Sequence, residues 1–464
     1  MSRPRDPRPS VGIVGLGYMG LSTGLAFAAH GLPVFGYDIK PEIRTAVASG
    51  STPYQEVELG ELLKAQLRSQ RFHVVDSPEE VAERAEGIFL CVPTPSLPSG
   101  RIDVRPLEKS AEQIGSALMA PRGYRLVVVK STVVPGTTQS LVAPIIQRRS
   151  GRSSQQVGVA SNPEFLAEGT MVRDALHPDR IVLGTNDRRS LAWLRRVYRP
   201  FHAPIFNLSP AGAELVKYSA NAFLAVKVSF ANELSRLADR LGVNVDSVVT
   251  AVGHDPRIGE RFLQAGPGFG GSCFEKDLRA LVARSTDLGL HFRSGEAALR
   301  INQEQLAYVV DRIRAAVGPL SGKKLALLGL SFKAGTDDVR ESRALLLARE
   351  LVTSGATVRG HDPVALENFR RAWDSHYADT DGHLKLFNTV EEALNGADAA
   401  ILQADWPIYA RWPSAWSRRM KRPLLVDLRR ALNPRAARRA GLTVLGLGAG
   451  NAHPNDQRVP RRVP

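Results

Sequence analysis

Cysteine is almost absent from this chain, whose 464 residues include only Cys91 and Cys273. Two cysteines cannot form a disulfide framework, and no CxxC pair or cysteine–histidine cluster has the spacing of a zinc site. Long apolar runs are also missing, since no stretch approaches the roughly 18 residues that span a bilayer. Residues 1–10 are rich in proline and arginine, where a signal peptide would be apolar. We therefore expect a cytoplasmic protein that binds no metal and no membrane.

A concentrated basic stripe is lacking too, although the formal charge is +15, from 61 Lys and Arg against 46 Asp and Glu. The arginines occur in scattered pairs such as Arg148-Arg149 and Arg195-Arg196. A nucleic-acid footprint would gather them on one face. We expect a basic solvated surface and no nucleic-acid partner, and such a surface would also suit an anionic small substrate.

The chain is long enough for two or three domains at roughly 150 residues each. With 43% hydrophobic and 23% charged residues it can bury substantial cores, which excludes a disordered protein. Its first half alternates helical stretches with short apolar runs, a pattern typical of a parallel sheet with helices on both faces. The predicted strands are Val11–Val14, Val34–Tyr37, Ile88–Val92, Leu126–Val129, Val157–Ala160 and Ile181–Gly184.

A long helix is predicted after this block, because no glycine or proline occurs between Gly212 and about Leu241 and apolar residues recur at helical intervals. A second alternating block begins at Lys323. Its predicted strands are Leu325–Leu328, Thr357–Gly360, Ala399–Leu402 and Leu424–Val426. The fold class is therefore α/β, with two doubly wound lobes joined by a long central helix. Ligands of such folds bind at the carboxyl ends of the strands, so we expect the active site in the crevice between the lobes.

A glycine-rich sequence, Gly15-Leu16-Gly17-Tyr18-Met19-Gly20, directly follows the first strand and opens a helix. In a Rossmann-like lobe the first glycine permits a tight turn, the second lets a pyrophosphate approach, and the third allows close packing of helix and strand. Asp38 ends the second strand, where a carboxylate accepts hydrogen bonds from a ribose diol and repels a 2′-phosphate. The pattern predicts an NAD site, against the alternative of a tight turn without a ligand.

Two pairs of polar residues are spaced four apart near the expected crevice. Lys217 and Asn221 share one face of the long helix, where two donors could hold an oxyanion and a lysine could shuttle a proton. Glu164 and Glu168 follow a strand end, where carboxylates could bind sugar hydroxyls or orient a water. The alternatives are a solvated helix face for the first pair and helix-start carboxylates for the second.

Cys273 is the more informative of the two cysteines. It ends the glycine-rich stretch 266–272 and precedes the predicted helix Phe274–Leu288, with Asp277 one turn further on. A helix N-terminus lowers the pKa of a thiol and so raises its nucleophilicity. We interpret Cys273 as a nucleophile rather than core filling, and Cys91, within a buried strand, as the reverse.

Several motifs together resemble the nucleotide-sugar dehydrogenase family, which includes the UDP-glucose and GDP-mannose dehydrogenases. The resemblance covers about Val11 to Gly448, and it is closest to members that act on UDP-glucose. It rests on the GLGYMG loop, VPTP at Val92–Pro95, KSTVVPGT at Lys130–Thr137, SNPEFLAEG at Ser161–Gly169, the Lys217/Asn221 helix, GFGGSCFEKD at Gly268–Asp277, and GLSFKAGTDDVRES at Gly329–Ser342.

The resemblance implies a four-electron oxidation in which the C6 primary alcohol of a nucleotide sugar, UDP-glucose first of all, becomes a carboxylate and two NAD⁺ are reduced. The intermediate aldehyde has no second hydride to donate until a nucleophile makes its carbon tetrahedral. Cys273 would form that thiohemiacetal and then a thioester, which water hydrolyses. By resemblance, Lys217 and Asn221 stabilise the oxyanion. Asp277, with Thr132 and Glu168, activates the water, and Glu164 supports proton transfer.

The resemblance also implies the binding residues. The cofactor would contact Gly15, Gly17, Tyr18, Met19, Gly20, Asp38, Thr94, Thr132, Glu168, Lys276 and Arg340. The substrate would contact Glu164, Phe165, Leu166, Lys217, Asn221, Phe262, Leu263, Gly266, Gly270 and Lys333, together with Arg257, which in the family crosses from a second subunit. A homodimer built on the long helix is therefore expected.

The implied domains are an NAD-binding Rossmann domain at 11–205, an all-α central domain at 206–305 that carries the catalytic lysine and cysteine and the dimer contact, and a nucleotide-sugar-binding α/β domain at 320–449. We expect disordered tails at 1–10 and 450–464.

Two segments depart from the family pattern. Glu275 stands where many members have proline or glutamine, and it would oppose thiolate formation if it pointed inward, so we expect it to point outward. Asp427-Leu428-Arg429-Arg430 replaces a segment that usually carries glycine and asparagine. Ser272 matches the members that act on UDP-glucose, since those acting on N-acetylated mannosamine usually have histidine there.

Three alternatives stay open. One is the same chemistry on dTDP-glucose, GDP-mannose or UDP-N-acetylmannosamine. Another is a two-electron hydroxyacid dehydrogenase, which would leave Cys273 and the second lobe unexplained. The third is an NAD-binding sensor without turnover, which needs only the first lobe.

Overall fold

The computed structural model describes residues 8–52, 54–120, 123–377 and 382–450. These residues form two compact units, which divide between Ala220 and Asn221. The predicted tails lie outside the described residues except for residues 8–10 and Gly450. Arg8 Nη1 donates to the Gly31 carbonyl (2.7 Å), and the Ser10 hydroxyl accepts from the Glu86 amide (3.0 Å). Arg8 and Ser10, placed in the tail by the sequence, are therefore hydrogen-bonded to the first unit.

The first unit contains an eight-stranded sheet in the order β3-β2-β1-β4-β5-β6-β7-β8. Its strands are β1 Val11–Val14, β2 Val34–Tyr37, β3 Phe72–Val74, β4 Gly87–Leu90, β5 Arg125–Val129, β6 Val157–Ser161, β7 Ile181–Gly184 and β8 Ile205–Leu208. Neighbouring strands are parallel, as predicted, except that β6 and β7 are antiparallel. The edge strands β3 and β8 were not predicted.

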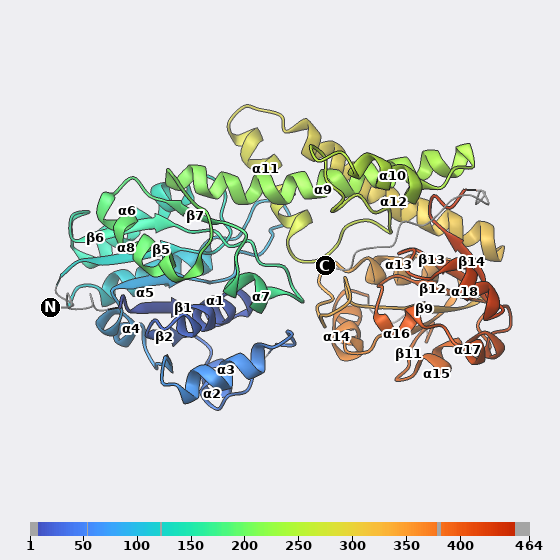
Figure 1. The fold of residues 1–464 in the computed structure, drawn as a ribbon, viewed down its shortest axis with the longest axis horizontal. Coiled ribbons are helices and arrows are strands. Elements are labelled where there is room, and N and C mark those ends of the chain that lie inside the picture. Colours follow the sequence, from blue (N-terminus) through green and yellow to red (C-terminus); the bar gives the residue numbers. More distant parts are fainter. Residues whose placement is uncertain (1–7, 53, 121–122, 378–381, 451–464) are drawn as a thin grey trace. The chain divides into compact units, whose positions relative to one another are not determined.

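Helices cover both faces of this sheet (Figure 1). Because side chains of a strand alternate between faces, Leu126 and Val128 join a core cluster with Trp193 and Leu194 of one helix, while Val127 is buried on the opposite face. The helices are α1 Tyr18–Ala29, α2 Pro41–Ala48, α3 Leu59–Arg68, α4 Pro78–Arg84, α5 Arg105–Ala117, η1 Thr138–Val142, α6 Ala143–Ser150, α7 Met171–Leu176, α8 Arg188–Tyr198 and η2 Arg199–Phe201.

The predicted long helix is α9, Pro210–Leu241, with 32 residues. Proline suits the first turn of a helix because its missing N–H would have no partner there. The buried Glu214 carboxylate accepts from the amides of Gly136 (2.6 Å) and Thr138 (2.8 Å), which fixes the first part of α9 to the loop after β5.

Three further helices precede the second sheet, in agreement with the all-α middle domain predicted from the sequence. They are α10 Val245–Gly253, α11 Phe274–Asp287 and α12 Arg293–Val317. Helix α12 lies beside the second part of α9 (Figure 1). The Ser229 hydroxyl of α9 donates to the Ala298 carbonyl (3.0 Å), and Arg236 Nε donates to Gln305 Oε1 (2.9 Å).

The second sheet is six-stranded and parallel, in the order β11-β10-β9-β12-β13-β14. Alternate strand residues build two cores, with Leu327 and Ile401 in one and Leu328 and Leu402 in the other. The strands are β9 Lys324–Leu328, β10 Thr357–His361, β11 Leu384–Leu386, β12 Ala399–Leu402, β13 Leu424–Asp427 and β14 Thr443–Gly446. The helices are α13 Arg343–Thr353, α14 Leu366–His376, α15 Val390–Leu394, α16 Pro407–Ala410, α17 Ser414–Arg419 and α18 Pro434–Arg439.

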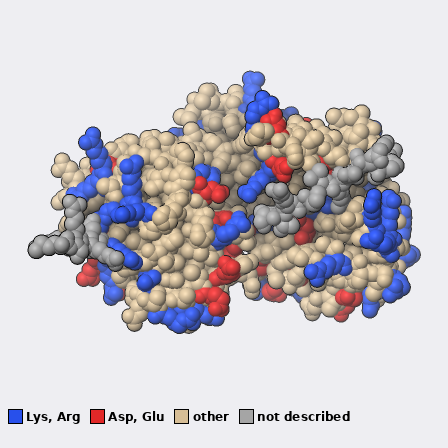
Figure 2. All heavy atoms as spheres, viewed as in Figure 1, with Lys and Arg blue, Asp and Glu red and all other residues tan. Residues whose placement is uncertain are grey.

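The charged surface is mixed. On the face that Figure 2 shows, Lys and Arg side chains occur in separate groups, with Asp and Glu between some of them. Within the described ranges, no helix combines the length and apolarity needed to cross a membrane.

Candidate active site

The glycine-rich loop of the first unit joins β1 to α1. Gly15 has a φ of +97°, and a Cβ there would lie 2.6 Å from the Cys91 carbonyl oxygen, whereas a Cβ on Gly20 would clash with the Gly15 carbonyl. Gly17 differs, since the nearest atom to a Cβ there is the Tyr54 hydroxyl at 3.9 Å. The loop is therefore tight where helix and strand pack, and it has space at Gly17, where α1 begins. The N–H groups in the first turn of a helix have no acceptor within the helix and can bind an anion.

Asp38, at the end of β2, completes this candidate dinucleotide site. Its Oδ2 accepts from the Leu16 amide (2.8 Å) and its Oδ1 from the Lys40 amide (2.9 Å), and the side chain stays partly exposed. The Tyr18 ring packs on Tyr54 with centroids 4.3 Å apart. The space at Gly17, the helix N-terminus and the accessible carboxylate fit the pyrophosphate and ribose of NAD.

The second lobe also has an aspartate after its second strand, but this aspartate is buried. Asp362 follows β10 as Asp38 follows β2, and its Oδ2 accepts from the amides of Leu330 (2.7 Å) and Ser331 (3.0 Å). Its Oδ1 accepts from Val364 (3.0 Å) and Ala365 (2.9 Å), and the residue is buried. Backbone amides of the second lobe thus occupy the Asp362 carboxylate. Of the two carboxylates, Asp38 is the one available to a ribose.

The loops after β4 and β5 meet beside the glycine-rich loop. Thr94 Oγ1 donates to the Thr132 carbonyl (2.8 Å), and Ser131 Oγ donates to the Val92 carbonyl (2.6 Å). Since β1 and β4 are neighbours at the point where the strand order reverses, Thr94 and Thr132 lie where such folds bind ligands.

Glu164 and Lys217 form a buried ion pair within the first unit. Glu164 Oε1 lies 2.8 Å from Lys217 Nζ, and their side chains are 12% and 6% exposed. Glu164 Oε2 accepts from the Leu166 amide at 2.5 Å. The pKa of Glu164 is lowered: burial opposes ionisation, but the charge and hydrogen bonds of Lys217, then Leu166 and Lys130, outweigh it.

The segment that carries Glu164 is not helical, so the four-residue spacing to Glu168 does not place the two carboxylates on one helix face. Glu168 is buried, and two cations lie over the Phe165 ring, with Arg180 3.7 Å and Lys217 5.7 Å from its centroid. Glu164 and Lys217 are therefore brought into contact by tertiary structure.

Cys273 occupies the N-cap position of α11, as predicted, and its thiol is exposed and forms no disulfide with Cys91. The Ser272 hydroxyl lies 3.6 Å from its sulfur. One turn on, Asp277 is buried and held from two sides, because its Oδ2 accepts from Asn221 Nδ2 (2.6 Å) and its Oδ1 from Lys276 Nζ (2.5 Å). The second unit thus places an accessible thiol one helical turn from an oriented carboxylate.

Buried amides hold the loop that leads to Cys273. The Gly266 amide donates to Asn232 Oδ1 (2.8 Å), and Gln305 Nε2 donates to the Gly266 carbonyl (2.7 Å). Asn302 bonds both backbone groups of Phe269, at 2.8 and 3.0 Å. None of these three side chains was predicted as a site residue.

Comparison with known proteins identifies this arrangement. Residues 9–202 match the NAD binding domain of the UDP-glucose/GDP-mannose dehydrogenase family, residues 211–304 its central domain, and residues 326–434 its UDP binding domain. The chain belongs to the UDP-glucose/GDP-mannose dehydrogenase family. It is accordingly an NAD-dependent oxidoreductase of that family.

Among similar proteins, UDP-glucose 6-dehydrogenase AglM of Haloferax volcanii is 38% identical over 430 residues, which cover 91% of this chain and 97% of that protein. UDP-glucose 6-dehydrogenase YwqF of Bacillus subtilis is 34% identical over 440 residues, covering 95% and 97%. A solved UDP-glucose dehydrogenase of Pyrobaculum islandicum has a TM-score of 0.88 at 38% identity, over 97% of this chain and 100% of that one. UDP-D-ManNAc dehydrogenase of Pyrococcus horikoshii has a TM-score of 0.82 at 27% identity, over 96% and 100%.

The remaining predicted site residues of this family member lie in the second unit in different settings. Phe262 is exposed and has a φ of +65°, whereas Leu263 is buried in a small core. Arg257 is largely exposed and pairs with Asp255 of its own chain (2.6 Å). A substrate could therefore reach the side chain of Phe262 but not that of Leu263.

Lys333 and Arg340 lie on the segment between β9 and α13. Lys333 Nζ is 5.5 Å from the centroid of the Phe332 ring, and Arg340 pairs with Asp338 (2.6 Å). The same segment contacts the cysteine loop, because the Gly271 amide donates to the Glu341 carbonyl (3.3 Å). This backbone contact explains the glycine at 270, where a Cβ would clash with the Glu341 carbonyl oxygen.

Glu275, the first departure from the family pattern, forms an ion pair within its own helix. Glu275 was expected to point outward, but its side chain is only 18% exposed and pairs with Arg279 (2.6 Å). The expectation of exposure was wrong, because the helix places Arg279 one turn on to neutralise the carboxylate.

The second departure builds internal contacts. Asp427 is buried, which raises its pKa, and it accepts from the amides of Arg429 (3.1 Å) and Leu432 (2.9 Å). Arg430 pairs with Asp246 (2.7 Å), and Arg429 Nε donates to the Gln403 carbonyl (2.6 Å). Both arginines therefore hold the backbone and neighbouring helix of the second unit.

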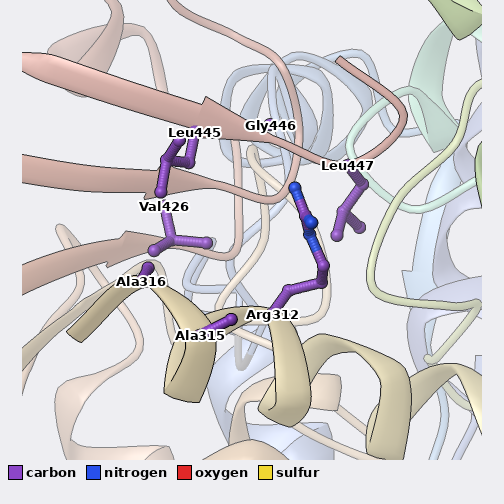
Figure 3. Close-up of a pocket in the computed structure, with 7 residues that line it drawn as sticks. All are labelled: Arg312, Ala315, Ala316, Val426, Leu445, Gly446 and Leu447. Atoms are coloured by element: carbon purple, nitrogen blue, oxygen red, sulfur yellow. The ribbon is translucent and has the colours of Figure 1, made fainter. Parts of the chain in front are cut away.

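A small cavity of about 180 Å³ also lies in the second unit, between α12 and the carboxyl ends of β13 and β14 (Figure 3). The Arg312 side chain lies among otherwise apolar groups there and pairs with Asp239 (3.7 Å). The volume of this cavity is below the roughly 300 Å³ at which ligand pockets begin. In the described part of the chain, no cluster of three His, Cys, Asp or Glu side chains could hold a metal ion.

Proposed function

We propose that this chain oxidises the C6 primary alcohol of UDP-glucose to the carboxylate of UDP-glucuronate, with two NAD⁺ reduced per substrate. The observation that carries the proposal is the position of the exposed Cys273 thiol at the start of α11, one turn before the oriented Asp277 carboxylate. A two-electron alcohol dehydrogenase has no use for a nucleophile in this position.

The chemistry needs that nucleophile because an aldehyde carbon cannot lose a second hydride until it is tetrahedral. The glycine-rich loop and Asp38 would hold NAD⁺, which would supply a hydride acceptor for each of the two oxidations. Between the two oxidations, the Cys273 thiolate adds to the aldehyde carbon and the carbonyl oxygen takes a proton, giving a thiohemiacetal. Loss of the second hydride and of that proton leaves a thioester, and water releases the acid and regenerates the thiol.

Each proposed role follows from a contact or from the family pattern. Lys217 and Asn221, four residues apart on α9, would stabilise the oxyanion, and Glu164 would exchange a proton with Lys217 across their 2.8 Å ion pair. Asp277 would orient or deprotonate the hydrolytic water. The further roles of Thr132 and Glu168, and the other cofactor and substrate contacts named from the sequence, stay predictions.

UDP-glucose is favoured among nucleotide sugars for two reasons. The relatives of 38% and 34% identity are named UDP-glucose 6-dehydrogenases, whereas the UDP-D-ManNAc dehydrogenase is 27% identical. Ser272 also stands at the position where the family pattern has histidine in the enzymes for N-acetylated mannosamine.

We also infer a homodimer built on α9. Phe223, Phe230 and Leu237 recur every seven residues and are 64%, 47% and 54% exposed in the single chain. A seven-residue apolar repeat favours packing against a second helix. The cytoplasmic location stays a prediction from the sequence.

The proposed function is tested by the stoichiometry of turnover with excess NAD⁺. UDP-glucose should give two NADH and one UDP-glucuronate per molecule consumed, at a kcat/KM at least about tenfold above those for dTDP-glucose, GDP-mannose and UDP-N-acetylmannosamine. One NADH per substrate would indicate a two-electron dehydrogenase, no NADH an NAD-binding sensor, and a higher kcat/KM for another sugar would reassign the substrate.

A further inference from the structure

A buried lysine that the mechanism above does not use lies next to the Glu164–Lys217 ion pair. Lys130 directly follows β5, and the residue is 6% exposed. Its Nζ donates to two neutral acceptors, the carbonyl oxygen (3.2 Å) and the Oδ1 (3.0 Å) of Asn162. Within the described ranges, no carboxylate lies within ion-pair distance of it. A buried ammonium without a carboxylate partner is strongly unfavourable, so a packing role explains Lys130 poorly.

The partner of Lys130 is built into the segment that carries Glu164. Asn162 lies two residues before Glu164, and its Nδ2 donates to the Val182 carbonyl of β7 (2.8 Å). Its Oδ1 also accepts from the Tyr198 hydroxyl of α8. Lys130 therefore bonds both the backbone and the side chain of a residue that is fixed on two further sides.

Charge links the same residues. The Lys130 cation lowers the pKa of Glu164, after the larger effect of Lys217. Burial, and to a smaller extent repulsion from Lys217, lower the pKa of Lys130 to about 8. Lys130, Glu164 and Lys217 together carry one net positive charge when all three are ionised.

The other ionisable groups coupled to Lys130, Glu164 and Lys217 include two neutral side chains and one further cation. Burial raises the pKa of the Cys91 thiol after β4 to about 12, and that of the Tyr198 phenol still further, so both are neutral near pH 7. Arg180 is a cation over the Phe165 ring and is also electrostatically coupled to Glu164. Lys130 belongs to this set but lies outside the Glu164–Lys217 ion pair, so replacing it changes the net charge of the set without removing either partner of that pair.

We propose that Lys130 is a positioning residue of the reaction, whose buried positive charge acts through Glu164 and Lys217 to favour release of their protons and to stabilise the oxyanion. The proposal rests on the proposed function for the identity of the oxyanion. Removing a nearby cation raises the pKa of a carboxyl and of an amine alike, so the direction of the effect is the same whichever of the two accepts the substrate proton.

The test is the pH dependence of kcat in Lys130→Met, with Lys130→Gln as a second variant that can still donate to the Asn162 carbonyl. In both variants the acidic limb of the profile should move to higher pH by about one unit, so kcat on that limb should fall about tenfold. On the alkaline plateau, kcat should stay within about threefold of the wild-type value. Lys130→Arg keeps the charge and should restore the wild-type limb. Lys109→Met, an exposed lysine on α5, should change nothing.

An equal loss of kcat at every pH with an unmoved limb, or a limb that moves downward, would overturn the proposal. The profile is recorded with whichever nucleotide sugar the wild type oxidises, so a wrong substrate assignment is detected in the wild type and does not imitate a negative result.

A second readout needs no turnover. A lysine with a pKa of about 8 when folded and 10.5 when unfolded binds fewer protons in the native state between these values, so its contribution to stability rises with pH there. The denaturant midpoint of the wild type should therefore increase relative to Lys130→Met from pH 8 to 10. A constant difference would show that Lys130 is not an unfavourable buried cation and would refute the proposal.

Discussion

Asp38 and Asp362 follow equivalent strands in the two lobes, yet their surroundings give them different roles. Each accepts a backbone amide from the loop after the first strand of its lobe, Leu16 in one case and Leu330 in the other. Asp362 is buried and accepts three further backbone amides, while Asp38 remains partly exposed. A carboxylate can bind a ribose only where its lone pairs reach solvent, which favours the first lobe for NAD.

Replacing Asp38 by alanine should therefore weaken NAD binding selectively. Loss of hydrogen bonds to a charged group costs about 1.5 to 3 kcal/mol, or roughly 10- to 150-fold in Kd. Isothermal titration of NAD into the variant measures this. Asp362→Asn is the matched control, and it should lower the melting temperature while its Kd for NAD stays at the wild-type value. An unchanged Kd in Asp38→Ala would remove Asp38 from the site.

Among the elements, helix α9 is exposed along a stripe that a second copy could cover. A charge placed within such an interface leaves an unpaired buried group, so Phe230→Glu should shift the protein toward monomer. Sedimentation velocity over a range of concentrations measures the shift. Glu79→Gln, at an exposed position of α4 away from this stripe, should keep the wild-type mass. A monomeric wild type, or a Phe230→Glu protein of unchanged mass, would contradict the dimer on α9.

The strands that the sequence failed to reveal share one physical property. The prediction found every interior strand of both sheets within two residues at either end, but it missed β3, β8, β11 and β14, which are the four sheet edges. Edge strands are paired on one side only and need no continuous apolar run. Phe206 and Leu208 of β8, for example, are exposed. The search for buried runs therefore finds the centre of a sheet and overlooks its margins.

The residues of the candidate site likewise divide into those that the sequence could predict and those that it could not. Glycine spacing, the position of Asp38 and the placement of Cys273 before a helix could be predicted because they depend on local chain geometry. The groups that hold the cysteine loop, Asn232, Asn302 and Gln305, come from other helices and have no local signature beyond being polar residues on buried faces. Lys130 lay in a recognised motif without an assigned role, because only the fold reveals that its charge is buried.

On the scale of the whole molecule, the two units have separate sheets and separate cores, so each should respond to its own ligand. We expect two calorimetric transitions. NAD should raise one and UDP the other, each by about 5 to 10 °C at a hundredfold excess over Kd, since such an excess stabilises by about 2.7 kcal/mol. A single transition that both ligands shift equally would argue against separate binding units.

The central claim is that Cys273 holds the substrate covalently between two oxidations. Asp277→Asn should slow hydrolysis and let the thioester accumulate, so acid-quenched enzyme turning over UDP-glucose with NAD⁺ can be analysed by intact-protein and peptide mass spectrometry. The account predicts the added mass of a UDP-glucuronyl group on the peptide that contains Cys273, absent when Cys273 is also replaced by serine. An unmodified cysteine, with free aldehyde released as the end product, would contradict it.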